Sequence, residues 1–301
     1  LYFAKCGSHP APCDYSGTDT LQCKPSFQKR YGGNNADIGY SMVTNADGSY
    51  VVAGYTNSFG NGGYDGYLQK MDKNGKLVWS KTYGSSGNDY FYSLKKTADG
   101  GYIAVGNTTS YGGSATGIAW MVKTDANGNL QWSRKYDDGN AQGSVAWDVS
   151  TTSEGGYVIS GTNRYAPSFA NAMVIKTDIS GAVQWAKSFE SGNSDQSSGI
   201  LEDQDTLVVT AVQYGQGSTL YNAVIMKLNK NDGSVLWSRN YDIEGRSNWP
   251  GKIYQTTNGY SFSVYDDINF SLGSPEHVVV NTDKNGSPLS VAKISDIIPN
   301  L

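Results

Sequence analysis

The chain has 301 residues, a formal net charge of -4 and only 17% charged residues. This composition excludes the broad basic field that attracts nucleic acid or an anionic membrane surface. No apolar run approaches the roughly 20 residues that a membrane-spanning helix needs, so we expect no membrane span. The 37 glycines and 22 tyrosines are typical of turn-rich antiparallel sheet. The composition therefore favours an all-β protein.

Residues 1–26 form a leader that we expect to be irregular. All three cysteines of the chain, Cys6, Cys13 and Cys23, lie within it. Their spacings match neither a paired Cys-x-x-Cys zinc site nor a haem-attachment site. We favour one disulfide in an oxidising compartment, with the third thiol free or bonded to another chain. Three reduced cysteines in a cytosolic protein are the alternative. The leader thus favours a secreted or cell-surface protein.

Residues 27–301 repeat one stretch that combines a tight turn with a tryptophan. Its copies are Asp72–Tyr83, Asp125–Tyr136, Asp178–Phe189, a looser Asn229–Tyr241, and a worn copy from Asp283 that has Ser290 in place of tryptophan. The tryptophans Trp79, Trp132, Trp185 and Trp237 are 53, 53 and 52 residues apart. A period in this range, with each unit dense in short strands, indicates the blades of a β-propeller.

Each repeat is interpreted as four strands, which in the first repeat are Ser41–Thr44, Tyr50–Thr56, Gly66–Met71 and Leu77–Tyr83. The first three strands occur five times, which predicts five four-stranded antiparallel blades. The repeats run at about 32–83, 84–136, 137–189, 190–241 and 242–294. The fourth strand occurs six times, because Phe27–Tyr31 matches it and Ser290–Ile294 is a degraded copy. We expect Phe27–Tyr31 to complete the last blade and close the ring; six blades are the alternative.

One resemblance follows from these motifs. Asp99-Gly-Gly-Tyr-Ile103, followed by Lys123-Thr-Asp-x-x-Gly-x-x-x-Trp132, resembles the secreted bacterial and archaeal β-propeller repeats labelled SBBP-type. The Asp-x-x-Gly-x-x-x-Trp part is similar to the tryptophan-docking motif of quinoprotein propellers. The resemblance covers residues 27 to about 295 and implies blade construction, but it implies no chemistry. We find no cofactor motif of the quinoprotein enzymes in this chain.

The four repeated tryptophans are expected to dock neighbouring blades, since one per repeat at a fixed turn is what packing predicts; exposed ligand stacking is the alternative. Turns such as Asp72–Gly75 lack the later carboxylates of a calcium loop, so we predict no metal site. His9 and His277 have no evident partners, and no catalytic motif is present. We therefore predict no catalytic residue and no cofactor.

The loops after the second and fourth strands emerge on one face of a propeller, and here they carry aromatic residues. Ligand-binding candidates on this loop face are Phe59, Tyr111, Tyr165, Tyr214 and Phe270, with Trp147 and Trp249. Aromatic rings among Asn, Asp, Ser and Gly suit sugars, because the rings stack on C–H faces while polar groups bind hydroxyls. The alternative is that these rings only cap the blades.

These patterns favour a secreted, non-enzymatic binding or adhesion propeller that recognises glycans or a surface partner. One alternative is a structural subunit of an extracellular filament, joined through the leader or the C-terminal tail by strand exchange. A less favoured alternative is a glycoside hydrolase, for which carboxylates must converge; its candidates are Asp37, Asp89, Asp148 and Asp195. Asn107, Asn269 and Asn285 lie in N-glycosylation triplets.

Overall fold

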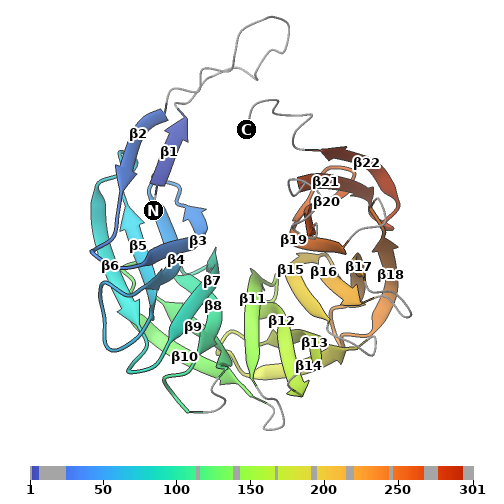
Figure 1. Ribbon diagram of the computed structural model, residues 1–301, viewed down its shortest axis with the longest axis horizontal. Coiled ribbons are helices and arrows are strands. Elements are labelled where there is room, and N and C mark those ends of the chain that lie inside the picture. Colours follow the sequence, from blue (N-terminus) through green and yellow to red (C-terminus); the bar gives the residue numbers. More distant parts are fainter. Residues whose placement is uncertain are drawn as a thin grey trace, which may run out of the picture.

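A computed structural model describes residues 2–6, 25–112, 116–137, 143–166, 169–190, 195–214, 220–243, 247–267 and 277–293. Over these ranges the chain forms β-strands joined by turns and loops (Figure 1). Within the same ranges, no helix has the length and apolar character needed to cross a membrane.

Twenty of the 22 strands form five four-stranded antiparallel blades, which confirms the predicted five-bladed propeller. The first blade contains β3 (Asp37–Thr44), β4 (Tyr50–Thr56), β5 (Asp65–Met71) and β6 (Leu77–Tyr83). The second contains β7 (Asp89–Lys96), β8 (Tyr102–Thr108), β9 (Ile118–Thr124) and β10 (Leu130–Tyr136). The third contains β11 (Ser144–Thr151), β12 (Tyr157–Ala166), β13 (Phe169–Thr177) and β14 (Val183–Phe189). The fourth contains β15 (Gln196–Asp203), β16 (Thr206–Tyr214), β17 (Tyr221–Asn229) and β18 (Val235–Tyr241). The fifth contains β19 (Ser247–Gln255), β20 (Gly259–Asp267), β21 (His277–Asp283) and β22 (Pro288–Lys293).

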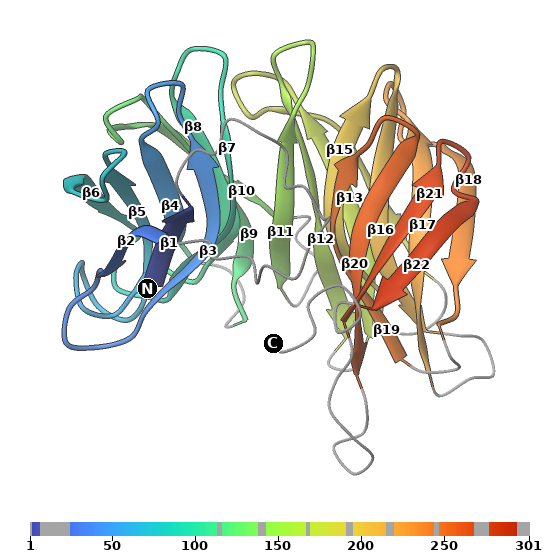
Figure 2. The same cartoon turned by 90° about the horizontal axis from the view of Figure 1, so that it is seen from above.

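The strands are ordered from the centre outward in each blade, with β3, β7, β11, β15 and β19 innermost (Figures 1 and 2). In the second blade the middle strands are covered on both faces by neighbouring blades, and every residue of β8 and β9 is buried. This is why these strands are apolar at successive positions instead of alternating. The core is shared between blades: Val51 and Leu68 of the first blade pack with Phe91 and Leu94 of the second.

Each blade docks on the next through its outer strand. The Trp79 ring lies against Gly128, where a Cβ atom would be 2.9 Å from the indole, and Gly128 has a φ of +75°. The Tyr83 hydroxyl donates a hydrogen bond of 2.6 Å to the carbonyl of the same glycine. The ring contact recurs in the pairs Trp132–Gly181, Trp185–Gly233 and Trp237–Gly286. Glycine is required at these turns because both the backbone angle and the indole exclude a side chain.

The hydroxyl contact recurs in the pairs Tyr136–Gly181 and Tyr241–Gly286. Between the third and fourth blades, Phe189 has no hydroxyl to donate. There the Nε1 atom of Trp185 donates a hydrogen bond of 3.0 Å to the Lys230 carbonyl. This junction therefore keeps one hydrogen bond to the turn, from a different side chain.

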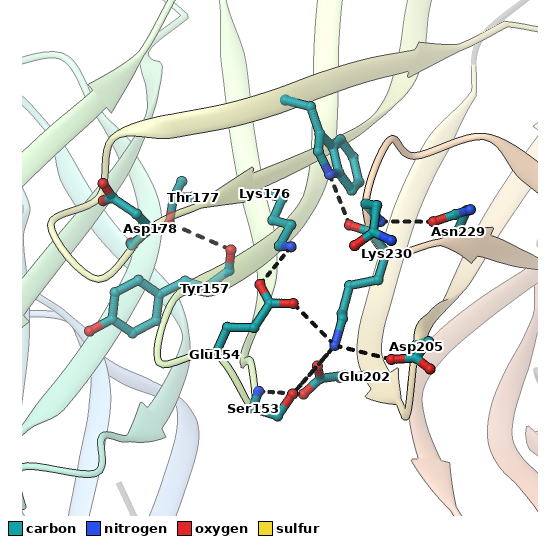
Figure 3. A network of polar contacts seen from close by, with 12 residues as sticks. Ser153, Glu154, Tyr157, Lys176, Thr177, Asp178, Glu202, Asp205, Asn229 and Lys230 are labelled. Atoms are coloured by element: carbon teal, nitrogen blue, oxygen red, sulfur yellow. Dashed lines mark hydrogen bonds and ion pairs between the residues drawn. The ribbon is translucent and has the colours of Figure 1, made fainter.

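An ion network built on two buried lysines adds to the junction of the third and fourth blades (Figure 3). The Lys230 ammonium group lies 2.9 Å from Glu202 and 3.3 Å from Glu154. Glu154 also lies 2.8 Å from Lys176, so it bridges two cations. The hydrogen bond to Glu202 raises the pKa of Lys230, which stays charged at neutral pH. The network joins the first turn of the third blade to the end of β15 and to the second turn of the fourth blade.

The two ends of the chain depart from the expected closure. Tyr2–Cys6 in the leader is a strand, β1, and it pairs with β2 (Pro25–Arg30) in a separate two-stranded sheet. The fourth strand of the fifth blade is β22, so the prediction that Phe27–Tyr31 completes this blade is wrong. Strand pairing uses the backbone, and Ser290 pairs with Asn281 as Trp79 pairs with Lys70. Loss of the tryptophan therefore does not displace the worn strand.

Candidate functional site

The inner strands share an irregularity in their pairing with the second strands. The register of β3 shifts between Gly39 and Ser41, and that of β7 shifts between Phe91 and Ser93. In β11 the shift lies between Ala146 and Asp148. The extra residues at these β-bulges are Tyr40, Tyr92 and Trp147. A bulge bends its strand and re-aims the extra side chain, and bulges are common beside binding sites.

These three residues belong to a group of rings that we call the inner aromatic cluster. Its members are Tyr40, Tyr55, Tyr64, Tyr90, Tyr92 and Trp147. Tyr92 lies 5.1 Å from Tyr40, edge to face, and 4.7 Å from Trp147. Tyr55 lies 4.9 Å from Tyr90 and 5.2 Å from Tyr64. These separations are within the range of favourable ring contacts. The cluster spans the inner edges of three blades.

The cluster combines ordered rings with exposed surface. Tyr40 is 50% exposed, and the other members are half-buried. Burial, followed by a hydrogen bond with Tyr40, raises the pKa of Tyr55 to about 12. Burial likewise raises the pKa of Tyr90 and of Tyr92, so these phenols stay neutral and can donate hydrogen bonds at physiological pH. The Nε1 atom of Trp147 donates a hydrogen bond of 2.9 Å to the Thr162 hydroxyl, and this bond fixes the orientation of the indole ring.

The residues that follow the bulges form an inner polar network. The Asp148 carboxylate accepts a hydrogen bond of 2.6 Å from Ser93 and one of 3.2 Å from the backbone of Ile200. The Nζ atom of Lys252 lies 3.2 Å from the Asp148 carboxylate and donates a hydrogen bond of 3.0 Å to the Ser93 hydroxyl. Asp148 is 2% exposed, so its carboxylate is removed from solvent, whereas the Lys252 side chain is 30% exposed. The network joins four blades beside the inner aromatic cluster.

The other predicted carboxylates do not join Asp148. Asp37 accepts hydrogen bonds from Thr56 and Ser58 of its own blade. Asp89 repeats this arrangement with Thr108 and Ser110. Asp195 accepts a hydrogen bond of 3.3 Å from the backbone of Tyr214. These three residues each tie the start of an inner strand to the end of its neighbour, and Asp148 alone of the four belongs to the inner polar network.

A further carboxylate, Asp65, is buried where the first two blades meet. It accepts a hydrogen bond of 3.0 Å from the backbone of Asn61. Burial and the nearby Asp89 carboxylate raise the pKa of Asp65 to about 6, against the effect of the Asn61 hydrogen bond. Asp65 therefore titrates well above the usual range of an aspartate. Within the described ranges, no three His, Cys, Asp or Glu side chains are grouped so that they could hold a metal ion.

The predicted loop aromatics lie in several places. Phe59 stacks on Tyr67 at 6.0 Å, which is the packing expected of a blade cap. Tyr111 lies 6.1 Å from Trp120, and both line a pocket of about 300 Å³ between the first two blades. Tyr214 and Trp249 both contact Tyr221, at 5.0 and 4.7 Å. Among the predicted ligand-binding residues whose side chains the structure describes, only Trp147 joins the inner aromatic cluster.

Several predicted residues fall outside the described part of the chain. They are the Tyr165 side chain, Phe270, Cys13, Cys23, the Cys6 side chain and Asn269. Among the glycosylation candidates, Asn107 is only 6% exposed, so the folded chain does not present it to an enzyme. Asn285 is exposed in a turn.

The sequence does contain a signal for the residues that were missed. Tyr40-Ser41, Tyr92-Ser93 and Trp147-Asp148 are equivalent pairs in three repeats, each an aromatic followed by a small polar residue. Lys252 occupies the matching place in the fifth repeat, directly before Ile253. Aligning the inner strands on the apolar residue that follows each pair, which is Met42, Leu94 or Val149, reveals this column.

No family model matches the sequence. No curated protein matches it either. Similar solved structures include a protein of unknown function from Dyadobacter fermentans, with a TM-score of 0.56, 12% identity, and coverage of 79% of this chain and 74% of that chain. Drosophila Semaphorin 1b, extracellular domains 1-2, has a TM-score of 0.50 and 8% identity, covering 87% of this chain and 55% of that one. A GH43 endo-arabinanase from Bacillus licheniformis has a TM-score of 0.44 and 12% identity, covering 86% and 100%. At these identities the likeness concerns the fold alone.

These similarities correct one expectation. The sequence favoured a protein that is not an enzyme, but the similar structures include GH43 arabinanases and a GH43 β-1,3-galactosidase. Similar propellers thus include enzymes as well as the semaphorin and plexin structures. The fold gives no ground for excluding an enzyme.

Proposed function

We propose that the protein binds carbohydrate at the inner aromatic cluster. The observation that carries this proposal is the row of bulge residues Tyr40, Tyr92 and Trp147, which the first three blades present side by side at their inner edges. Successive rings offer stacking faces for the C–H surfaces of sugar rings. Neutral phenol groups beside them supply hydrogen bonds to hydroxyls. An extended glycan is a better match than a single sugar, because the rings lie on three blades.

The cluster also has the rigidity that a binding site needs. Tyr92 is held between Tyr40 and Trp147, and the hydrogen bond to Thr162 orients Trp147. Rings that are ordered before binding lose little conformational entropy when a ligand arrives. We place this binding outside the cell, a proposal supported by the three cysteines within the first 23 residues.

The test is a screen of soluble oligosaccharides, followed by titration calorimetry on each hit. Tyr40→Ala is the informative variant, because this ring is half exposed and its removal leaves the buried core intact. We expect it to weaken binding at least about tenfold, or about 1.4 kcal/mol. Tyr254→Ala is the matched control: Tyr254 also lies on an inner strand and is 62% exposed, but it is outside the cluster.

Two results oppose the proposal. Absence of saturable binding across the panel contradicts carbohydrate recognition, and equal affinities for the wild type and Tyr40→Ala place the site elsewhere. Release of reducing ends from a bound glycan is measured in the same samples. Turnover that depends on Tyr40 would show that the cluster serves an enzyme instead of a binding module.

A further inference from the structure

The pocket of about 300 Å³ between the first two blades is separate from the inner aromatic cluster. Its lining comes from the outer strands β6 and β10, from β9, and from Tyr111 in the connection that follows β8. None of the six members of the cluster lines it. The volume is at the lower limit of ordinary ligand pockets, so it suits a small molecule such as a single sugar ring.

One wall of the pocket is built on stacked aromatic rings. Trp120 is 2% exposed and stacks on Phe91 at 4.9 Å. Tyr111 lies 6.1 Å from Trp120 and is 44% exposed. The Tyr111 hydroxyl donates a hydrogen bond of 3.1 Å to the Gly84 carbonyl, and the Lys135 ammonium donates one of 2.6 Å to the Tyr111 carbonyl. The exposed ring is therefore held in position before any ligand arrives.

The polar part of the lining is positively charged. It contains Lys81 and no Asp or Glu. The Lys81 stem lies against the turn of the second blade, where a Cβ atom on Gly128 would be 3.2 Å from Cγ. Within the described residues Lys81 makes no hydrogen bond or ion pair, whereas the equivalent Arg134 donates a hydrogen bond of 3.3 Å to the Ser180 carbonyl. The Lys81 ammonium is therefore available to a ligand.

Trp120 also has an unused donor. Its Nε1 atom is buried and makes no hydrogen bond within the described ranges. Buried donors in folded proteins nearly always have a partner, so each exception requires an explanation. A ligand that brings an acceptor to this wall would satisfy the indole.

The makeup of the pocket is not required by blade construction. Trp120 pairs with Lys135 across β9 and β10. The corresponding pairs of the other four blades are Tyr67–Thr82, Met173–Ser188, Val224–Asn240 and Val279–Ala292. None of these pairs combines a ring with a cation. Contacts that build the propeller recur between repeats, as the docking of Trp79 on Gly128 does, so the exception in the second blade points to a ligand.

The carboxylates near this pocket are withdrawn from its surface. Burial, followed by the charges of Asp89 and Asp65, raises the pKa of Tyr111. Neither carboxylate lines the pocket, and these two residues are 0% and 2% exposed. Asp89 accepts hydrogen bonds from two hydroxyls of its own blade. The surface that a ligand meets thus carries the charge of Lys81.

We propose that this pocket is a second binding site, which takes a carboxylate carried on a small ring, as in a uronic acid. The C–H face of the ring packs against Tyr111, and the carboxylate accepts a hydrogen bond from Lys81. Such a carboxylate occurs in a free sugar acid and at the end of a glycan chain, and the experiment separates these two sources. The proposal does not depend on the inner aromatic cluster, because the two sites share no residue.

The test is titration calorimetry of the full chain with D-glucuronate and with D-glucose, which has the same ring without the carboxylate. We expect saturable one-to-one binding of glucuronate and at least about tenfold weaker binding of glucose. An oligosaccharide that ends in glucuronate is compared with the free acid in the Tyr40→Ala chain, to reduce binding at the cluster. Tighter binding of the oligosaccharide assigns the pocket to glycan ends, and equal or weaker binding assigns it to free sugar acids.

Two pairs of variants locate the site. Lys81→Met should weaken glucuronate binding at least about tenfold. Lys187→Met is its control and should leave the affinity unchanged, because the Lys187 stem lies on a turn glycine in the same way but far from the pocket lining. Tyr111→Ala should weaken binding about fivefold. Phe59→Ala is its control, since Phe59 is the equivalent ring of the first blade and is 47% exposed.

Circular dichroism and thermal unfolding first establish that each variant is folded. Absence of saturable glucuronate binding, or equal affinities for glucuronate and glucose, overturns the proposal. Equal affinities of Lys81→Met and Lys187→Met for glucuronate overturn the location. Loss of glucuronate binding in Tyr40→Ala but not in Lys81→Met would assign this ligand to the cluster instead. The two proposals therefore fail separately, because Tyr40→Ala tests the cluster and Lys81→Met tests this pocket.

Discussion

The Nζ atom of Lys252 lies 3.2 Å from the Asp148 carboxylate, which joins the fifth blade to the third. Lys252→Met should destabilise the protein by about 3 kcal/mol, because it leaves a buried carboxylate without its cation. The double variant Asp148→Asn, Lys252→Met should recover part of this loss. Urea unfolding of the wild type, both single variants and the double variant gives the coupling energy. Strictly additive losses would mean that the pair contributes nothing across the blades.

The turn glycines allow a controlled measurement of blade docking. Gly128→Ala should lower the free energy of unfolding by about 1–2 kcal/mol because of the left-handed backbone alone. The loss should be larger still, because the added Cβ atom would lie 2.9 Å from the Trp79 ring. Gly100→Ala is the control: its φ is +82°, close to the +75° of Gly128, and no atom lies within 4 Å of its Cβ position. The difference between the two variants in thermal unfolding measures the docking contact. Equal losses would contradict a role for the tryptophan.

The hydrogen bonds from the tyrosine hydroxyls should contribute less to the free energy of unfolding than the contacts of the turn glycines. Tyr136→Phe removes the 3.0 Å hydrogen bond to the Gly181 carbonyl and should lower stability by about 1 kcal/mol. The third blade already has phenylalanine at this place, and Trp185 Nε1 bonds to its neighbour's turn instead. Trp185→Phe should therefore cost more than Tyr136→Phe in the same denaturant series. A smaller loss for Trp185→Phe would show that its indole hydrogen bond does not replace the hydroxyl.

Asp65 should make stability depend on pH between about 4 and 6. Its folded pKa of about 6 exceeds the value near 3.9 of an unfolded chain, so in this window the folded state binds more protons. This contribution is fully present below pH 4 and is lost as pH rises through 6. Asp65→Asn should be more stable than the wild type at pH 7.5 and equal to it at pH 3.5. Asp205→Asn, which changes a turn residue whose side chain is 97% exposed, is the control for a general charge effect. An unchanged pH profile in Asp65→Asn would contradict the prediction.

The features that were predictable from sequence are those fixed by contacts repeated in every blade. Trp79 and Gly128 recur at a constant spacing because each indole needs a turn glycine in the next blade. The five-blade count came from the first three strands of each repeat, which occur five times, because the tryptophan itself occurs in only four repeats. The sequence also predicted that Phe27–Tyr31 is a strand. Its sheet could not be predicted, because it depends on pairing with Tyr2–Cys6, which lies far away along the chain.

The candidate site was less accessible to sequence reasoning. A bulge inserts one residue, and the pairing register with the second strand passes over Tyr40 and Tyr92, so counting residues along the two strands does not show that these are the extra ones. Asp148 and Lys252 lie far apart in sequence, and nothing local to either residue identifies the other. Met42 and Leu94 occupy equivalent places, but their exposure differs because it depends on what lies in front of each blade. Bulge positions, ion pairs between distant residues and the exposure of a side chain depend on residues that are close in space but far apart in sequence.

The docking contacts run in one direction around the propeller, from the outer strand of one blade to the turn of the next. Each of the first four repeats thus carries both the donor surface for its successor and the acceptor surface for its predecessor. If one repeat were duplicated within the gene, both new junctions would be complementary at once. A lineage with this architecture can therefore gain or lose whole blades while every junction keeps a working set of contacts.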